Sequence, residues 1–186
     1  MAPEAVISTA PRLIRRDTGT MTQQQPFESI GRWGQVEIRR YPEHTIAEVV
    51  VDGDFDDAGN RGFRPLFGYI QGQIAMTAPV VQTPGVEGHT VAFVMPEGRD
   101  LDTLPAPTDS RVHLRTVPEQ VAAALRFSGW GNASDLDRRG QQLLTALAGS
   151  PWKPVGVVRL ARFNAPFIPP FLRHNEVVVD VEPRSS

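Results

Sequence analysis

The sequence predicts an α+β fold, in which two helices pack against an antiparallel sheet that is curved into a distorted or open β-barrel. Two observations predict it. A segment beginning at Val36 recurs, with substitutions, from Val112, so that pairs such as Gly53 and Gly129 lie 76 positions apart. Each copy contains two strand patterns followed by one helical pattern, and few connections could hold a crossover helix between parallel strands. We therefore expect two similar β-β-α-β-β halves, packed face to face.

The first half opens with two strand patterns that flank a turn. Residues 35–41 and 45–51 are rich in β-branched and apolar residues, and Pro42, Glu43 and His44 between them have the composition of a turn. A further strand is predicted over residues 91–95, which end at a proline.

A helix is predicted between these strands. Its apolar residues recur at helical spacing and predict one buried stripe. Pro65 stands inside the pattern, where it would cost about 3 kcal/mol in a helix interior. The helix is therefore expected to begin near residues 60–62 or to be kinked at the proline. The residues of the stripe are Phe63, Leu66, Phe67 and Ile70.

The second half contains clearer helix boundaries. Ser134 and Asp137 have the spacing of a capping box, with Asp in place of the usual Glu or Gln, and Gly149 is a natural C-terminal cap. Two long β-rich segments follow, over residues 155–163 and 177–181. The buried stripe of this helix is predicted to be Leu136, Leu143, Leu144 and Leu147.

Length and composition limit the classes of protein. The chain has 186 residues, a net charge of −2 and no cysteine, which predicts one domain and excludes disulfide and thiolate chemistry. The charge gives no basic face for nucleic acid, no segment has the apolar length of a membrane span, and the absence of cysteine fits a cytoplasmic protein. We expect residues 1–26 to be a disordered leader and residues 27–183 to be the single domain, with halves at about 33–98 and 110–183.

Several segments resemble a known family. They occur in family order over residues 27–182, nearly the whole predicted domain, and together they are similar to the SOUL haem-binding protein family. The segments are Val36–Tyr41, Ile74–Val80, Val91–Pro96, Phe127–Gly129 and Arg173–Val177.

The resemblance implies a pseudo-twofold antiparallel barrel with two helices, and it implies binding of haem or another tetrapyrrole, for haem buffering, transport or delivery. The chain departs from the pattern at one position. Some animal members of the family are proposed to ligate haem iron through a histidine just before the tyrosine of the first strand motif. This chain has Arg40 there, followed by Tyr41.

Haem requires an apolar slot, cations for its two propionates and, optionally, one axial ligand. Phe55 and Tyr69 fall off the buried helical stripe and are candidate walls of the slot. The family motif places Met76 near the proposed groove, although a methionine is more often an ordinary core residue. The candidate partners of the propionates are Arg40, Arg61 and Arg64, and surface arginines would show the same pattern.

The candidate axial ligands are histidines. His44, in the turn between the first two strands, is the first choice, and His174 is the second. A histidine in a loop or on the surface is the ordinary interpretation of both. Glu176 follows shortly after His174 and could act as a base in a barrel mouth, although a structural role for Asn175 and Glu176 in tying a loop to the last strand is favoured.

Two alternative functions stay open. One is an enzyme that uses the same pocket to degrade haem or hydrolyse a small molecule, but Ser128 lacks the flanking glycines of a nucleophile elbow. The other is an interaction module without a small ligand, in which the apolar loop of residues 167–171 would contact a partner.

Overall fold

The computed structural model describes residues 22–185, which form two α-helices, one short 3₁₀ helix and eleven strands. The helices are α1 (Phe55–Ile70) and α2 (Ala133–Ala148), and the 3₁₀ helix spans Pro170–Leu172. The strands of the main sheet are β2 (Glu28–Trp33), β3 (Val36–Tyr41), β4 (His44–Val51), β6 (Val80–Thr83), β7 (His89–Val94), β8 (His113–Val117), β9 (Gln120–Phe127), β10 (Trp152–Arg162) and β11 (Asn175–Pro183). The short strands β1 (Gln23–Gln24) and β5 (Thr77–Ala78) pair with each other in parallel.

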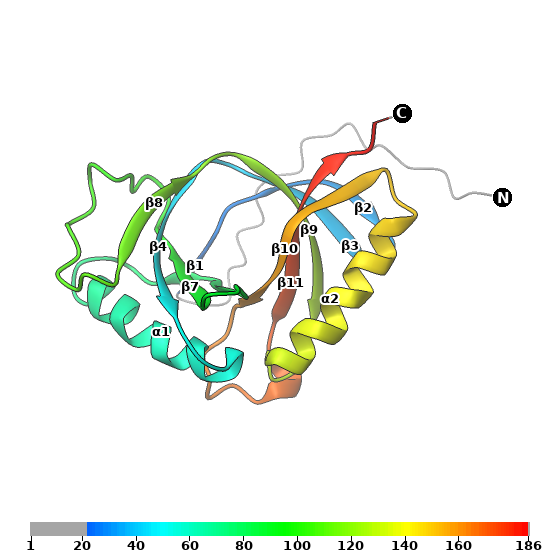
Figure 1. The fold of residues 1–186 in the computed structure, drawn as a ribbon. Helices are drawn as coiled ribbons and strands as arrows, with labels where there is room; N and C mark the ends of the chain where they lie inside the picture. The colour runs from blue at the N-terminus through cyan, green and yellow to red at the C-terminus, as the bar shows by residue number, and fades with distance from the viewer. Residues whose placement is uncertain (1–21, 186) are drawn as a thin grey trace.

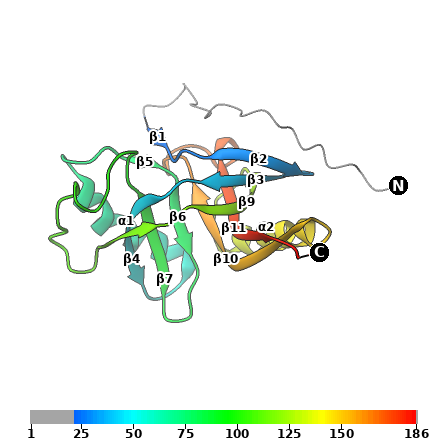
Figure 2. The same cartoon turned by 90° about the horizontal axis from the view of Figure 1, so that it is seen from above.

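The main sheet is antiparallel throughout and strongly curved (Figure 1). Its strands follow the order β2-β3-β9-β11-β10-β6-β7-β4-β8, so β2 and β8 are its two edges. The predicted α+β class, with two helices and a large antiparallel sheet, is confirmed. The sheet is open and does not close into a barrel. Figure 2, a view from above, shows β1 beside β5 near the start of β2.

The two halves of the chain have the same order of elements. β3-β4-α1-β6-β7 is followed by β8-β9-α2-β10-β11, and the order of these strands in the sheet reads the same from β3 and from β8 when the halves are exchanged. This symmetry is what a duplicated sequence would produce. The duplication itself stays a prediction.

The sheet separates two environments because successive side chains on a strand point to opposite faces. One face is covered by the helices, with α1 over β4 and β7 and α2 over β9, β10 and β11 (Figure 1). On β4, Ala47 and Val49 pack against Leu66 and Ile70 of α1. The alternate side chains of the same strand, such as Ile46, point to the opposite face, away from both helices.

Helix α1 begins earlier than the stripe predicts. It starts at Phe55, after Asp54, with two acidic residues in its first turn, where negative charge is favourable next to the helix dipole. Pro65 lies inside the helix. The predicted stripe is only partly buried, because Phe67 is 42% exposed whereas Leu66 and Ile70 are buried.

Helix α2 differs from the sequence prediction at its N-cap and agrees with it at its C-cap. The predicted capping box of Ser134 and Asp137 is wrong, because the cap is Asn132, whose side chain accepts a hydrogen bond from the backbone of Asp135. Gly149 is the C-cap, as predicted. Three leucines of the predicted stripe are buried and Leu144 packs against them.

Residues 1–21 of the predicted leader lie outside the described residues. Residues 22–26 of that segment are described, and they include β1. Within residues 22–185, no helix has the length and apolar character needed to cross a membrane.

Two glycines of α1 should respond oppositely to alanine. A Cβ at Gly62 would lie 2.6 Å from Val91 Cγ2, whereas a Cβ at Gly68 would meet nothing within 4 Å. We expect Gly62→Ala to lower the free energy of unfolding by about 1–2 kcal/mol through overpacking, and Gly68→Ala to raise it by up to about 1 kcal/mol through helix propensity. Urea unfolding of both variants checks this, and a loss at Gly68 that matched the loss at Gly62 would contradict it.

Candidate functional site

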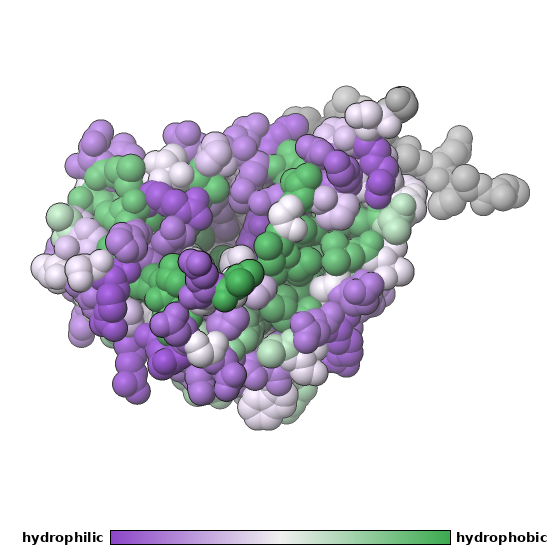
Figure 3. All heavy atoms as spheres, viewed as in Figure 1, coloured by the Kyte–Doolittle hydropathy of each residue, from purple (hydrophilic) through white to green (hydrophobic). Residues whose placement is uncertain are grey.

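A cavity of about 540 Å³ occupies the face of the sheet opposite the helices. Every strand of the main sheet except β2 contributes a side chain to it. The space-filling view shows a hollow near the centre of the surface, bordered by both hydrophilic and hydrophobic residues (Figure 3). Its volume lies within the range of small-molecule sites, about 300–1,000 Å³.

Small side chains on the sheet leave the space open. Ala92 on β7 and Ala161 on β10 line the cavity and are almost fully buried. Larger apolar groups form the surrounding wall, so that the interior is mainly apolar. These groups are Ile46, Val81, Val94, Val117, Val157, Phe163 and Val178.

A buried ion pair stands at one end of the cavity. The Arg39 guanidinium donates to Glu176 through Nη1 to Oε2 at 2.6 Å and through Nη2 to Oε1 at 3.0 Å. It also donates through Nε to Glu37 at 2.9 Å and through Nη1 to the Tyr41 hydroxyl at 3.1 Å. The phenyl ring of Phe27 lies over the guanidinium, 4.1 Å from its central carbon.

The ionisation of this pair follows from its contacts. Burial alone would raise the pKa of Glu176, but hydrogen bonds from His174 and Arg39, and the positive charge of Arg39, lower it to about 2. Burial likewise opposes the charge on Arg39, whereas the bonds to Glu176 and Tyr41 raise its pKa above its ordinary value. Burial raises the pKa of Tyr41. Glu176 is therefore a carboxylate and Tyr41 a neutral phenol near pH 7.

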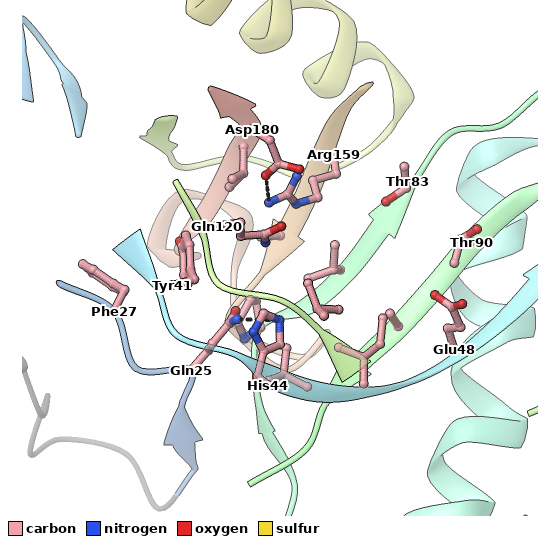
Figure 4. Close-up of a pocket in the computed structure, with 18 of the residues that line it drawn as sticks. Gln25, Phe27, Tyr41, His44, Glu48, Thr83, Thr90, Gln120, Arg159 and Asp180 are labelled. Carbon is pink, nitrogen blue, oxygen red and sulfur yellow. Dashed lines mark hydrogen bonds and ion pairs between the residues drawn. The ribbon is translucent and has the colours of Figure 1, made fainter. Parts of the chain in front are cut away.

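His44 faces the cavity (Figure 4), and its two hydrogen bonds define its tautomer. Its Nδ1 lies 2.8 Å from the carbonyl oxygen of Pro42, which can only accept, so Nδ1 carries the proton. Its Nε2 lies 3.1 Å from the side-chain nitrogen of Gln25 and accepts a hydrogen bond from it. Burial lowers the pKa of His44 below 6.5, and the charges of Arg159 and Arg115 act in the same direction. The imidazole is therefore neutral near pH 7.

Two further ion pairs lie on the cavity walls. Arg115 binds Glu48 through two bonds of 2.9 and 3.1 Å, and Arg159 binds Asp180 at 2.8 Å. Together with Arg39 and Glu176, the lining contains three guanidinium and three carboxylate groups. Because these charges balance, an anionic ligand would compete with these carboxylates for the arginines.

The structure brings one sequence-predicted site residue into the cavity, namely His44. His174 does not line the cavity. Its ring stacks on Phe163 with 4.1 Å between the ring centroids, and its Nε2 lies 2.7 Å from Glu176 Oε1. Arg40 points away and forms exposed ion pairs with Glu28 and Glu119.

The other predicted residues lie elsewhere. Arg61, Arg64 and Tyr69 come together in a separate surface hollow beside α1, with Arg111 opposite them. Phe55 is buried in the core beside α2, and Met76 is 36% exposed. Since the cavity lies across the sheet from α1, no side chain of that helix lines it. Their roles in binding stay predictions.

Sequence reasoning missed Arg39, Arg115 and Arg159, together with Glu48 and Asp180. It considered Glu176 as a base but did not pair it with Arg39. Strand alternation could have identified Arg39, because it shares a strand face with Tyr41, whereas Arg40 shares the other face with Val36 and Ile38. The pairing of Arg39 with Glu176 joins residues that are 137 positions apart, and no local pattern indicates it.

The comparisons with known proteins agree on the family. The SOUL heme-binding protein family matches residues 22–180 of the chain. Heme-binding protein 2 of Homo sapiens is 32% identical and that of Mus musculus 31% identical over 126 residues, and in each case the match spans 60% of this chain and 60% of the relative.

The fold is also found in solved structures of low identity. An uncharacterized conserved protein from Listeria innocua is similar with a TM-score of 0.61, at 13% identity, covering 80% of this chain and 92% of that one. Identity this low shows the fold alone. Because the family match extends over most of the chain, the chain belongs to the SOUL heme-binding protein family.

Proposed function

We propose that this protein binds haem, or a related tetrapyrrole, in the cavity on the open face of its sheet, and that it acts in haem buffering, transport or delivery. The family and the names of the two heme-binding relatives support the ligand class. The observation that carries the location is His44, a neutral imidazole on the wall of a cavity of about 540 Å³ that is lined by apolar side chains and three ion pairs.

The residues present fit the group. A histidine that ligates metal commonly donates its other ring N–H to a carbonyl or carboxylate, and His44 Nδ1 already donates to the Pro42 carbonyl. Bound haem would supply an iron centre that accepts the Nε2 lone pair. Arg115 and Arg159 lie on the walls where they could hold propionates, because guanidinium binds carboxylate well.

The open cavity bears on the alternative functions. An interaction module without a small ligand would be favoured by a cavity filled with its own side chains, and this cavity has space for a ligand. An enzyme that uses the same cavity stays a second proposal. Incubation of the haem complex with a reductant and oxygen distinguishes the two, because degradation would bleach the haem absorption and simple binding would leave it unchanged.

We expect haemin to saturate the protein near one equivalent, with a Soret band shifted from that of free haemin. His44→Ala should weaken binding by about tenfold or more, the scale found when ligand orientation at a metal is lost, and should remove the imidazole signature in electron paramagnetic resonance. Arg64→Gln, in the hollow beside α1, should change neither. Absorption titration of the three proteins measures this.

The same titration can contradict the proposal in two ways. Binding that does not saturate, or that is no tighter than to an unrelated protein, overturns haem binding. Saturable binding that is weakened by Arg64→Gln and unchanged by His44→Ala places the haem in the hollow beside α1 instead.

A further inference from the structure

The segment Gln23–Phe27 is not part of the main sheet, yet two of its side chains line the cavity. The described backbone pairing of this segment consists of the two-residue bridge between β1 and β5 and of one bond from the Gln25 amide to the Ala78 carbonyl at 2.8 Å. Segments with so few contacts open at lower free energy than the core of a sheet does. We call this segment the strap.

The strap donates a hydrogen bond to His44 Nε2, the nitrogen that would bind a metal. The tautomer of His44 leaves its lone pair on Nε2, and the Gln25 side-chain amide donates to that nitrogen at 3.1 Å. In Figure 4 the dashed line joins the two side chains at the edge of the cavity. While this bond exists, iron cannot take the same lone pair.

The other end of the strap is held by the buried ion pair. Phe27 lies over the Arg39 guanidinium at 4.1 Å and its ring centroid is 5.7 Å from that of Tyr41. The Phe27 contact does not involve His44. Gln25 can therefore leave His44 without disturbing the bonds between Arg39 and Glu176.

We propose that Gln25 is a specificity-determining residue of the cavity, and that the strap must release it before a metal-containing ligand is ligated by His44. This inference rests on the proposed function. A metal-free tetrapyrrole does not coordinate His44 Nε2, so its affinity does not depend on the release of Gln25. A metal-containing one loses the free energy of the Gln25–His44 bond, because only the released fraction of the protein is competent.

The first test compares Gln25→Ala with wild type for haemin and for metal-free protoporphyrin IX. One hydrogen bond contributes about 1 kcal/mol, so haemin should bind about fivefold tighter to the variant, while protoporphyrin affinity stays unchanged. Gln142→Ala, on the exposed face of α2, is the matched control and should change neither. Equal affinities of wild type and Gln25→Ala for haemin, or equal gains for both ligands, overturn the proposal.

The second test locks the strap. Gln24 and Ala78 are neighbours across the β1–β5 bridge, and the chain contains no cysteine, so Gln24→Cys with Ala78→Cys creates one disulfide. Oxidation should slow haemin association at least about tenfold and dithiothreitol should restore it, since the competent fraction limits binding. Lys153→Cys with Glu182→Cys, across β10 and β11, is the control. Equal rates in both redox states overturn the proposal.

A readout without haem separates failure of the strap from failure of the proposed function. Nitrogen NMR of the His44 ring should show a hydrogen-bonded Nε2 in wild type and an unbonded one in Gln25→Ala. An unchanged His44 spectrum overturns the strap whatever the haem result. Absence of saturable haemin binding, with the spectral change present, overturns the proposed function and the specificity role of Gln25, and confirms only the Gln25–His44 hydrogen bond.

Discussion

Glu176→Ala is expected to lower the free energy of unfolding by about 3 kcal/mol at pH 7, because it leaves the Arg39 guanidinium buried without its two-point partner. Glu37 and the Tyr41 hydroxyl remain bound to Arg39 and limit the loss. Urea unfolding of the wild type and the variant, analysed with a common m-value, measures this loss of stability.

A surface pair provides the control for this loss. Arg40 and Glu28 also form an ion pair, but both side chains are about half exposed, at 44% and 50%, and such pairs contribute about 0–1 kcal/mol. Glu28→Ala should therefore cost less than about 1 kcal/mol. Equal losses in the two variants would contradict the importance of burial. Arg39→Met combined with Glu176→Leu should recover much of the stability, because apolar replacements of a buried pair are often neutral.

The same residue predicts how stability depends on pH. The pKa of Glu176 is lowered from 4.5 to about 2 in the folded protein, so the unfolded chain takes up its proton at a higher pH than the folded protein does. The contribution of Glu176 is complete above pH 4.5 and is lost as the pH falls towards 2. A difference of this size corresponds to about 3 kcal/mol. Glu176→Ala should lose this part of the acid dependence.

Ala92→Phe is expected to weaken haemin binding by about 100-fold, which is about 2.7 kcal/mol, because the phenyl group would occupy the cavity. Ala92 lies on β7 between Glu48 of β4 and Val81 of β6, all three of which line the cavity. The unfolding free energy should change by less than about 1 kcal/mol, since the new side chain enters open space. Absorption titration and urea unfolding measure the two effects.

The matched control adds the same group outside the cavity. Val86 lies in the loop between β6 and β7 and is fully exposed, so Val86→Phe should leave haemin affinity unchanged. Haemin affinity in Ala92→Phe equal to that of wild type would place the ligand outside this cavity. Loss of affinity together with loss of folding would call for Ala161→Leu, a smaller addition to the same wall.

The elements of the fold follow from local patterns. Alternation and turn composition identified β3 and β4 to within one or two residues, and apolar spacing identified both helices. Boundaries failed where a single residue decided them. Asn132 caps α2 in place of Ser134, and only the direction of the preceding backbone selects between two polar residues that lie so close together.

The candidate site was less accessible to sequence reasoning. His44 was the first choice of axial ligand, and the structure places it on the cavity wall, as the first residue of β4 and not in the turn. Arg61 and Arg64 were expected to meet propionates and Tyr69 to wall the slot, but the three residues line another hollow. The side of a sheet on which a helix packs is a tertiary property. It decides that α1 cannot reach the cavity, and no local pattern contains it.

The division of the sheet into a helix-covered face and a cavity face has a consequence for divergence. On each strand, alternate residues face different surroundings. One set packs against the helices, and the other set lines the cavity and contacts its ligand. Apart from Arg39 and Glu176, whose buried ion pair stabilises the fold, residues of the second set can change at less cost to the fold than residues under the helices. Proteins with this architecture can therefore exchange one ligand for another while the scaffold persists.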